Sequence, residues 1–439
     1  MSINSRLSRS ELMMSKAGIR EHARNQAIRA RKGVMPWIYW GVAATFYLYE
    51  FFARVGPSVM ESTLQEQFQL SAAGMGFVMG LYYFAYAPMQ LVVGIALDRF
   101  GSKRLLSSAA IIAGFGCLLF ALAKSATMLG VGRVFLGIGS SFAYVGAVYV
   151  ATVWFPKSKL AFIMGMTAAL GTLGAALGQA PLESAVQSYG WRSAMYTAAI
   201  GGLIIATAIF MIVPRRPQWF LQLASIKTPE TKETMASALL SVVSRGQTWL
   251  VGCISLLIYV PITTFGALWG DTYIETTTGV SKESAAWAMS MLFFGFAAGG
   301  PLLGLLSDKI HKRNLPLLGG SIGCCITMTG LIFSPTLPFW FVVVLLTCTG
   351  FFVGAQAITF AIAVEQHESY HRATAVAFVN FFVMLGGFLL QPAFGAMLDV
   401  VSDGQQYSAE NYQFALILLP LSIGLGTVLC YWLKETAKE

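Results

Sequence analysis

The chain has 439 residues, of which 56% are hydrophobic and only 11% are charged. Soluble domains carry about 25% charged residues, so this composition excludes a water-soluble globular protein and predicts a surface that faces lipid. The net charge of +9 would suit a nucleic-acid partner. The basic residues gather in loops predicted on one side of a membrane, however, so we expect a lipid bilayer as the partner and no nucleic acid.

Twelve apolar segments are long enough to cross a hydrocarbon core about 30 Å thick as α-helices. Their predicted limits are 36–58, 73–95, 104–123, 127–152, 160–181, 192–213, 248–270, 284–306, 315–334, 338–363, 373–396 and 412–433. All six cysteines lie inside these segments. Cysteines in apolar segments are typical of small core residues, so we predict neither disulfides nor a metal site.

Lysine and arginine gather in alternate loops, and this asymmetry predicts orientation. Of the 29 basic residues, 24 lie in the segments that would be cytoplasmic with the N-terminus inside, and three lie in the outer loops. Both termini are therefore predicted to be cytoplasmic in an integral protein of a bacterial inner membrane.

The segment from Gly94 to Arg99 is echoed by the segment from Gly304 to Lys309, 210 residues later. Each copy is an apolar-Gly-x-x-x-Asp-basic hinge between two spans, and a repeat of half the chain length is typical of secondary transporters. We predict an all-α membrane protein with twelve transmembrane helices in two pseudo-symmetric six-helix bundles. The predicted parts are a cytoplasmic basic tail at 1–35, bundles at 36–213 and 248–433, a cytoplasmic linker at 214–247 and a cytoplasmic tail at 434–439.

These features resemble the major facilitator superfamily. The first hinge, with Asp98, Arg99, Gly101, Lys103 and Arg104, follows that family's signature, whereas the second copy has His311 in place of Gly101. Span four carries Arg133-x-x-x-Gly137-x-Gly139, a further motif of the family. The resemblance covers residues 36–433 and implies the major facilitator fold, rocker-switch transport and usually a monomer.

Aromatic motifs give a finer resemblance. They stand at Tyr47–Arg54 in span one, at Tyr82–Gln90 in span two and from Tyr259 onward in span seven. Together they are similar to the branch that holds phagosomal amino-acid transporters of intracellular bacteria and the lysosomal dipeptide uniporter. This similarity implies amino acids, short peptides or related carboxylates as solutes.

Three ionisable residues lie within the spans: Glu50, Arg54 and Arg133. Charges inside a membrane are expensive, and they mark functional sites by default. Glu50 and Arg54 share a helix face, where Arg54 would grip an anionic group and Glu50 would receive an ammonium or a proton. The alternative is an ion pair that neutralises itself. Arg133 is either a second anion contact or a brace for span four.

Other polar residues could line the same cavity, or could join helices by hydrogen bonds instead. The candidates are Tyr47, Tyr82, Tyr86, Gln179, Tyr259, Gln356, Asn380 and Gln391. In the organic-anion branch of the superfamily, acids stand where this chain has Ala53 and Ser140. Glu50 is therefore the one remaining candidate for proton coupling, and both proton symport and uniport stay open.

The doubled hinge is predicted to form the cytoplasmic gate of the outward-open state. Asp98 would lie near Arg372, and Asp308 would lie near Lys159. The gate candidates are Asp98, Arg99, Lys103, Asp308, Lys309 and Arg372.

The chain lacks a Gly-rich nucleotide loop and any catalytic or metal-ligand cluster in its sequence, so we predict neither an enzyme nor a cofactor. The predicted function is a secondary active or facilitative transporter of a small carboxylate-bearing solute, such as an amino acid, a short peptide or an organic acid. The alternatives are an exporter of drugs or metabolites and an importer of a carboxylate siderophore.

Overall fold

A computed structural model describes residues 21–215, 217–219, 235–333, 337–368, 371–402 and 407–436. Every regular element among these residues is helical. The predicted tail at 1–35 lies outside the described residues up to residue 20, and a helix at 21–30 follows. Ala23 and Ala27 of this helix pack against Val153 and Trp219, so the helix is attached to the part of the chain that contains these two residues.

The first half of the chain forms a bundle of packed helices, here called the N-terminal half. Its elements are α2 (Met35–Val55), η1 (Gly56–Met60), α3 (Glu61–Phe68), α4 (Ala72–Phe100), α5 (Ser102–Ala121), α6 (Ala126–Ser140), α7 (Ala143–Trp154), α8 (Lys157–Leu177) and α9 (Ala180–Ile212). Inside α9, Gly190 has a φ of 78°, a conformation that glycine adopts without steric penalty.

The second half, the C-terminal half, has a matching set of helices. Its elements are α11 (Met235–Val243), α12 (Gly246–Val260), η2 (Pro261–Trp269), α13 (Gly270–Thr278), α14 (Lys282–Ile310), α15 (Asn314–Phe333), α16 (Phe339–Val353), η3 (Gly354–Gln356), α17 (Ala357–Glu365), α18 (Arg372–Ser402), α19 (Ala409–Leu416), α20 (Leu418–Leu429) and η4 (Cys430–Trp432). The helix α11 lies within the predicted linker.

Ten stretches of the described residues are long and apolar enough to cross a membrane. The prediction of twelve differs for two reasons. The stretch Phe162–Ile212 counts once among the ten although it contains two predicted spans, which are separated at the break at Gly190. The helix α2 has 21 residues, carries Glu50 and Arg54, and is not among the ten stretches. The predicted all-helical membrane fold is confirmed.

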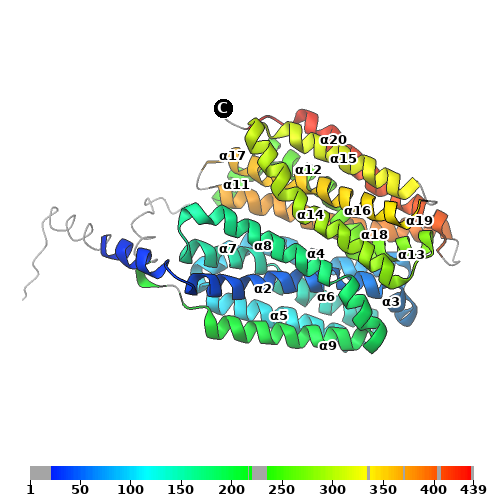
Figure 1. The fold of residues 1–439 in the computed structure, drawn as a ribbon, viewed down its shortest axis with the longest axis horizontal. Helices are drawn as coiled ribbons and strands as arrows, with labels where there is room; N and C mark the ends of the chain where they lie inside the picture. Colours follow the sequence, from blue (N-terminus) through cyan, green and yellow to red (C-terminus); the bar gives the residue numbers. More distant parts are fainter. Residues whose placement is uncertain are drawn as a thin grey trace, which may run out of the picture.

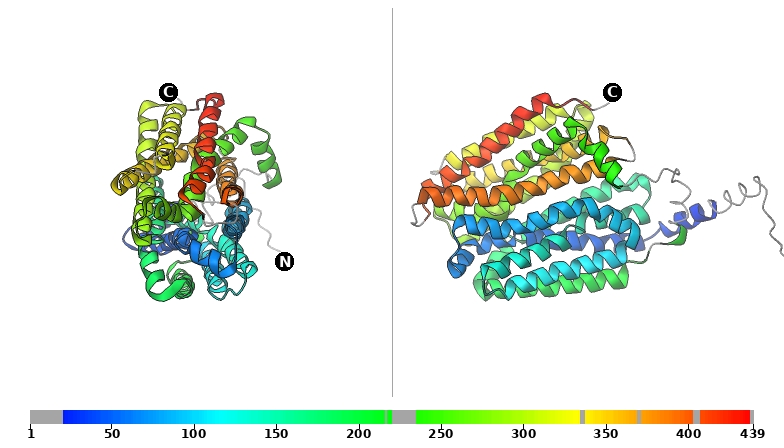
Figure 2. Two further views of the ribbon diagram at one scale, coloured as in Figure 1. Left: turned by 90° about the vertical axis from the view of Figure 1, so that its right-hand side faces the viewer. Right: turned by 180° about the vertical axis from the view of Figure 1, so that it is seen from behind.

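The two halves lie side by side, and their long helices run in similar directions (Figure 1). The N-terminal helix and the C-terminal tail lie at the same end of the molecule, while α3, α13 and α19 lie at the opposite end (Figures 1 and 2). We call this opposite end the far end. Both halves expose large apolar side chains, such as Phe162, Met211 and Ile326, as lipid contact requires.

The halves meet closely at the far end. A Cβ atom on Gly76 of α4 would lie 2.4 Å from the carbonyl oxygen of Gln391, and one on Gly395 of α18 would lie 2.2 Å from that of Ala72. The Asp399 carboxylate accepts hydrogen bonds from the backbone N–H groups of Ala72 and Ala73, each at 2.8 Å. The far end is therefore closed by direct backbone contact between α4 and α18.

The two hinges adopt different backbone conformations. Gly101 ends α4 with φ 78° and ψ 158°, a region open essentially to glycine. His311 ends α14 in the left-handed region, with φ 51° and ψ 41°, which histidine tolerates better than most residues. This difference explains how the second copy of the hinge dispenses with the glycine of the first.

Candidate solute site

The helix α2 places the charged pair at the centre of the molecule. It ends at Val55, because Gly56 and Pro57 begin the tighter turn of η1. Glu50 and Arg54 lie in its last two turns, and their residues are 0% and 2% exposed. At four residues apart they share one face of the helix, so the predicted juxtaposition is present.

Glu50, Arg54 and Tyr82 form one hydrogen-bonded cluster. Arg54 Nε donates to Glu50 Oε1 at 2.8 Å and lies 3.2 Å from the Tyr82 hydroxyl. Arg54 Nη2 and the Tyr82 hydroxyl donate to the same Glu50 oxygen. Glu50 Oε2 has no hydrogen-bond partner among the described residues. One carboxylate oxygen is thus crowded with donors while the other is free to accept a further ligand.

Aromatic rings enclose the guanidinium group. The Arg54 Cζ atom lies 4.1 Å from the Phe51 ring centroid, 5.5 Å from that of Tyr86 and 5.7 Å from that of Tyr82. Cation–π contacts of this kind stabilise a desolvated arginine by about 2 kcal/mol. These ring contacts therefore favour a charged guanidinium group on Arg54 although its surroundings are largely aromatic.

Two further tyrosines complete this group. Tyr47 packs against Phe51, with ring centroids 5.1 Å apart. Tyr259 comes from α12 in the other half and interacts electrostatically with Arg54. The structure thus brings together six of the predicted site residues, which we call the central cluster: Tyr47, Glu50, Arg54, Tyr82, Tyr86 and Tyr259.

Arg133 lies beside the central cluster but is directed at the backbone. Its guanidinium donates to the carbonyl oxygens of Ala53, Arg54 and Met79, at 3.3 to 3.5 Å. Its Cζ atom lies 4.8 Å from the Tyr82 ring centroid. These contacts tie α6 to α2 and α4, which favours the brace over the second anion contact.

Gln179 and Gln391 hold the backbone of η2 from two sides. Gln179 Nε2 donates to the Gly266 carbonyl at 3.1 Å, and Gln391 Nε2 donates to the Thr263 carbonyl at 2.7 Å. The π-helical turn of η2 shifts the backbone hydrogen bonds from the usual i→i+4 pattern to i→i+5, and the two amides add a side-chain donor to carbonyls in this buried turn. The matching glutamines therefore stabilise an irregular helix next to the central cluster.

Two other candidates lie away from this cluster. Gln356 donates to Ser255 Oγ at 2.7 Å, and this contact joins η3 to α12. Asn380 donates to Gln90 Oε1 at 2.9 Å, joining α18 to α4 across the two halves. Both make the helix–helix hydrogen bonds that were the alternative to solute binding.

The predicted gate residues are spread over both hinges. The Asp98 side chain lies outside the described part of the chain. Lys103 Nζ is 4.9 Å from the ring of Phe210, and Arg372 Nε donates to the His367 carbonyl at 3.3 Å. The proposed pairing of Asp98 with Arg372 stays a prediction for the other conformation.

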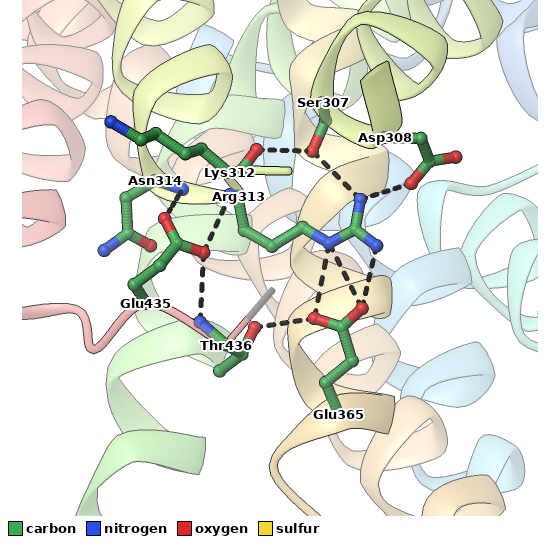
Figure 3. A network of polar contacts seen from close by, with 8 residues as sticks. All are labelled: Ser307, Asp308, Lys312, Arg313, Asn314, Glu365, Glu435 and Thr436. Atoms are coloured by element: carbon green, nitrogen blue, oxygen red, sulfur yellow. Dashed lines mark hydrogen bonds and ion pairs between the residues drawn. The ribbon is translucent and has the colours of Figure 1, made fainter. Parts of the chain in front are cut away.

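The second hinge is held within its own half, as Figure 3 shows. Arg313 bridges Asp308 at 2.5 Å and Glu365 at 2.8 Å. The hydrogen bonds that Arg313 donates to the Glu365 carboxylate raise the pKa of Arg313 above its usual range. Asp308 thus pairs with Arg313 in this conformation, and its contact with Lys159 likewise stays a prediction.

The C-terminal tail completes this network. Glu435 accepts hydrogen bonds from the backbone N–H groups of Arg313 and Asn314, at 2.8 and 3.1 Å, where α15 begins. A carboxylate at a helix N-terminus satisfies unpaired N–H groups and favours the helix dipole. The sequence analysis missed this contact, which joins residues 121 or more positions apart.

The fold and this site define a helical membrane transporter with a buried, charged centre. The Major Facilitator Superfamily pattern matches residues 40–273 and 251–439, and the chain belongs to that superfamily. It is a secondary transporter and not an enzyme.

Known proteins of this kind cover most of the chain. It is 25% identical over 377 residues to the probable sulfoacetate transporter SauU of Cupriavidus necator, covering 82% of this chain and 86% of that protein. It is 26% identical over 369 residues to the hexuronate transporter of Bacillus subtilis, covering 83% and 80%.

The solved structures agree on the fold. A bacterial homologue of the human lysosomal transporter Spinster, in an inward-facing and occupied conformation, aligns with a TM-score of 0.72. The alignment covers 92% of this chain and 97% of that one at 16% identity, so this likeness concerns the fold alone.

Proposed function

We propose that the chain carries a small organic anion across a bacterial inner membrane, with Arg54 as the group that binds its acidic end. The observation that carries this proposal is a fully buried guanidinium at the centre of the molecule with a single carboxylate partner. The named relatives carry or are assigned sulfoacetate and hexuronate, and both are small acids. A carboxylate or sulfonate would take two parallel hydrogen bonds from the arginine fork.

In this proposal the solute competes with Glu50 for Arg54. An acidic solute that takes the guanidinium leaves Glu50 buried without a counter-charge, which is costly. A proton bound at Glu50 removes that cost, so a solute anion and a proton would travel together. This step would give proton symport, whereas a Glu50 that never leaves Arg54 would give uniport.

A zwitterionic solute is the second candidate, and the free Glu50 Oε2 favours it. An amino acid or short peptide would present a carboxylate to Arg54 and an ammonium to Glu50. Such a solute compensates both charges by itself and needs no proton. The resemblance of the aromatic motifs to amino-acid and dipeptide carriers supports the same candidate.

Orientation and movement complete the proposal. The excess of basic residues in the loops at the terminus-bearing end assigns that end to the cytoplasm, so the far end would face outward. Transport would follow from rocking of the halves at 36–213 and 248–433 about the central cluster. The hinge residues Asp98, Arg99, Lys103, Asp308, Lys309 and Arg372 would close the cytoplasmic side in the opposite state.

Thermal melting of the purified monomer in detergent tests the solute class. Hexuronates, sulfoacetate, amino acids and dipeptides are added singly, because a ligand of the folded state raises the melting temperature by mass action. A hit is then followed by uptake into proteoliposomes with Arg54→Lys and with Arg24→Lys as an exposed control. We expect Arg54→Lys to lower saturable uptake by at least about 100-fold, with the control unchanged.

The outcomes separate the candidates. If the solute drives proton entry and Glu50→Gln abolishes that entry, the result supports an anion carried with a proton. If the solute is taken up without any proton entry, the result supports the zwitterion. Normal uptake by Arg54→Lys overturns the proposal. Stabilisation by bulky apolar compounds or carboxylate siderophores, without any small acid, would favour the exporter or the siderophore importer.

A further inference from the structure

Two carboxyl groups are buried where the halves meet at the far end, outside the central cluster. Glu61 begins α3 in the N-terminal half and is 1% exposed, while Asp271 lies in α13 of the C-terminal half and is 7% exposed. Thr272 Oγ1 donates to Glu61 Oε2 across the interface. The two acids therefore belong to the surface that closes the far end.

Most of their oxygen atoms lack a partner. Glu61 Oε1 and both oxygens of Asp271 make no hydrogen bond with the described residues. Ser58 Oγ accepts a hydrogen bond from Gln179 Nε2 at 3.1 Å, so its hydroxyl can still donate one hydrogen bond to Asp271, which it faces. Buried carboxylate oxygens are normally satisfied, and one serine hydroxyl cannot satisfy all three oxygens, so the pair calls for a further hydrogen-bond partner or a proton.

The surroundings add negative charge. The groups that face the pair are Glu183 from α9, Glu275 from α13, Lys282 from α14 and the hydroxyls of Tyr407 and Tyr412. Lys282 is the only basic group in this set, and its Nζ donates to Ser62 Oγ at 2.9 Å. Among the described residues, no ion pair includes Glu61 or Asp271.

The space between these residues is small. Ser58, Ser62, Glu183, Asp271 and Lys282 line a narrow cavity with room for about one water molecule. A water molecule could accept or donate hydrogen bonds there but would not supply a counter-charge. The described residues contain no group of three or more acidic, histidine or cysteine side chains that could hold a metal ion. The ligand that fits this chemistry is a proton.

We infer that Glu61 and Asp271 form a proton-binding site that locks the far end, separate from any proton carried at Glu50. In the closed state at least one of the two carboxyl groups is neutral and donates a hydrogen bond. Opening of the far end exposes both groups to water, and the proton leaves. Acidity on the far side therefore favours closure, whatever solute the central cluster carries.

The direction of the pH effect follows from Glu61, which lies outside the spans. Burial raises the pKa of Glu61 from its ordinary value of 4.5 to about 7 in the closed state. Below about pH 4.5 the group is protonated in both states, and as the pH rises through about 7 the advantage of the closed state is lost. The ratio of closed to open molecules should fall on the order of tenfold or more between about pH 5 and about pH 8.

Electron-paramagnetic distance measurements test the inference without any solute, so they are independent of the role of Arg54. Spin labels at Tyr189→Cys and Trp340→Cys report the far-end separation, since both residues are exposed, at 77% and 65%. The six native cysteines are first replaced. We expect the short-distance population to decrease as the pH rises.

The variants Glu61→Gln and Asp271→Asn mimic the protonated acids, and together they should keep the far end closed at every pH. Glu66→Gln, an exposed acid of the same helix, is the matched control and should retain the pH response. A double variant with the native pH response overturns the inference. The inference is also overturned if the labelled parent, with native Glu61 and Asp271, shows far-end distances that do not change with pH, a result that does not depend on either acid variant folding. A shift caused by Na⁺ at constant pH would reassign the site to a metal cation.

Discussion

The helices α2 and α12, which begin the predicted first span of each half, reach the central cluster in different ways. In the N-terminal half, α2 is continuous over 21 residues and carries Glu50 and Arg54 in its last turns. In the C-terminal half, α12 is regular for 15 residues and then changes to the π-helical turn of η2, whose side chains are uncharged. One helix presents fixed charges, and the other presents backbone carbonyls.

This difference suggests that the N-terminal half mainly binds the solute and that the C-terminal half mainly provides the movement. A buried arginine binds an anion well only if its helix and its neighbours hold it in place, and Arg133 holds the end of α2 through the carbonyls of Ala53 and Arg54. An irregular helix such as η2 changes shape more easily, and π-helical turns are frequent at functional sites. We therefore expect changes in α2 to affect solute binding and changes around η2 to affect movement.

Replacement of Arg54 by alanine should have the largest effect. It leaves the Glu50 carboxylate buried without its cation, and breaking a buried pair in this way destabilises a protein by about 3–5 kcal/mol. Thermal melting without solute should show a large decrease in stability. The double variant with Glu50→Gln removes both charges and should recover most of the loss. Equal melting temperatures for the native protein and Arg54→Ala would mean that the pair is not buried as described.

Substitution of Gly395 by alanine should affect movement rather than binding. The added Cβ atom would lie 2.2 Å from the Ala72 carbonyl oxygen, and backbone atoms cannot rotate away as a side chain does. Overpacking of this kind costs about 1–3 kcal/mol, and here the strain acts only while the far end is closed. Distance measurements should show a larger open population. Gly424→Ala, where nothing lies within 4 Å of the new atom, should behave like the native protein.

The fold was predictable because its signals are long and repeated. Each span is an apolar run of a length set by the bilayer, and the hinge at Gly94–Arg99 recurs at Gly304–Lys309. The break at Gly190 falls in the predicted gap between the spans at 160–181 and 192–213, whereas the π-helical turn at Pro261 was not predictable, because it depends on partners elsewhere in the chain. Gln179 and Gln391, which satisfy the carbonyls of η2, could be noticed in the sequence only as matching polar residues.

The site was predictable where charge alone marks it. Glu50 and Arg54 stand out in an apolar segment, and their spacing indicates a shared face. Gln356 and Asn380 are equally polar, yet they contact Ser255 and Gln90 instead of the central cluster. The direction in which a lone amide points depends on the rotation of its helix about its axis. That rotation is determined by packing, so a single residue in the sequence does not reveal it.

Substitution of Gln179 by leucine should give the smallest effect and the sharpest test of these different roles of the two halves. Its amide donates to Ser58 Oγ within the N-terminal half and to the Gly266 carbonyl of η2, and the second hydrogen bond connects the halves. Leucine is similar in size but removes the side-chain donor to that carbonyl, a loss of about 0.5–1.5 kcal/mol that applies only to the closed far end.

Solute affinity of Gln179→Leu, measured by melting shifts, should stay within about threefold of the native value, because the Arg54 cluster is intact. The far-end distances should broaden, and Gln26→Leu, at an exposed glutamine of the helix at 21–30 at the opposite end, should leave both measurements unchanged. If Gln179→Leu abolished solute binding while Arg54→Ala retained it, the roles of the two halves would be the reverse of those argued from α2 and η2. The solute would then be recognised mainly by polar groups around the irregular helix, and Glu50 and Arg54 would form a structural ion pair.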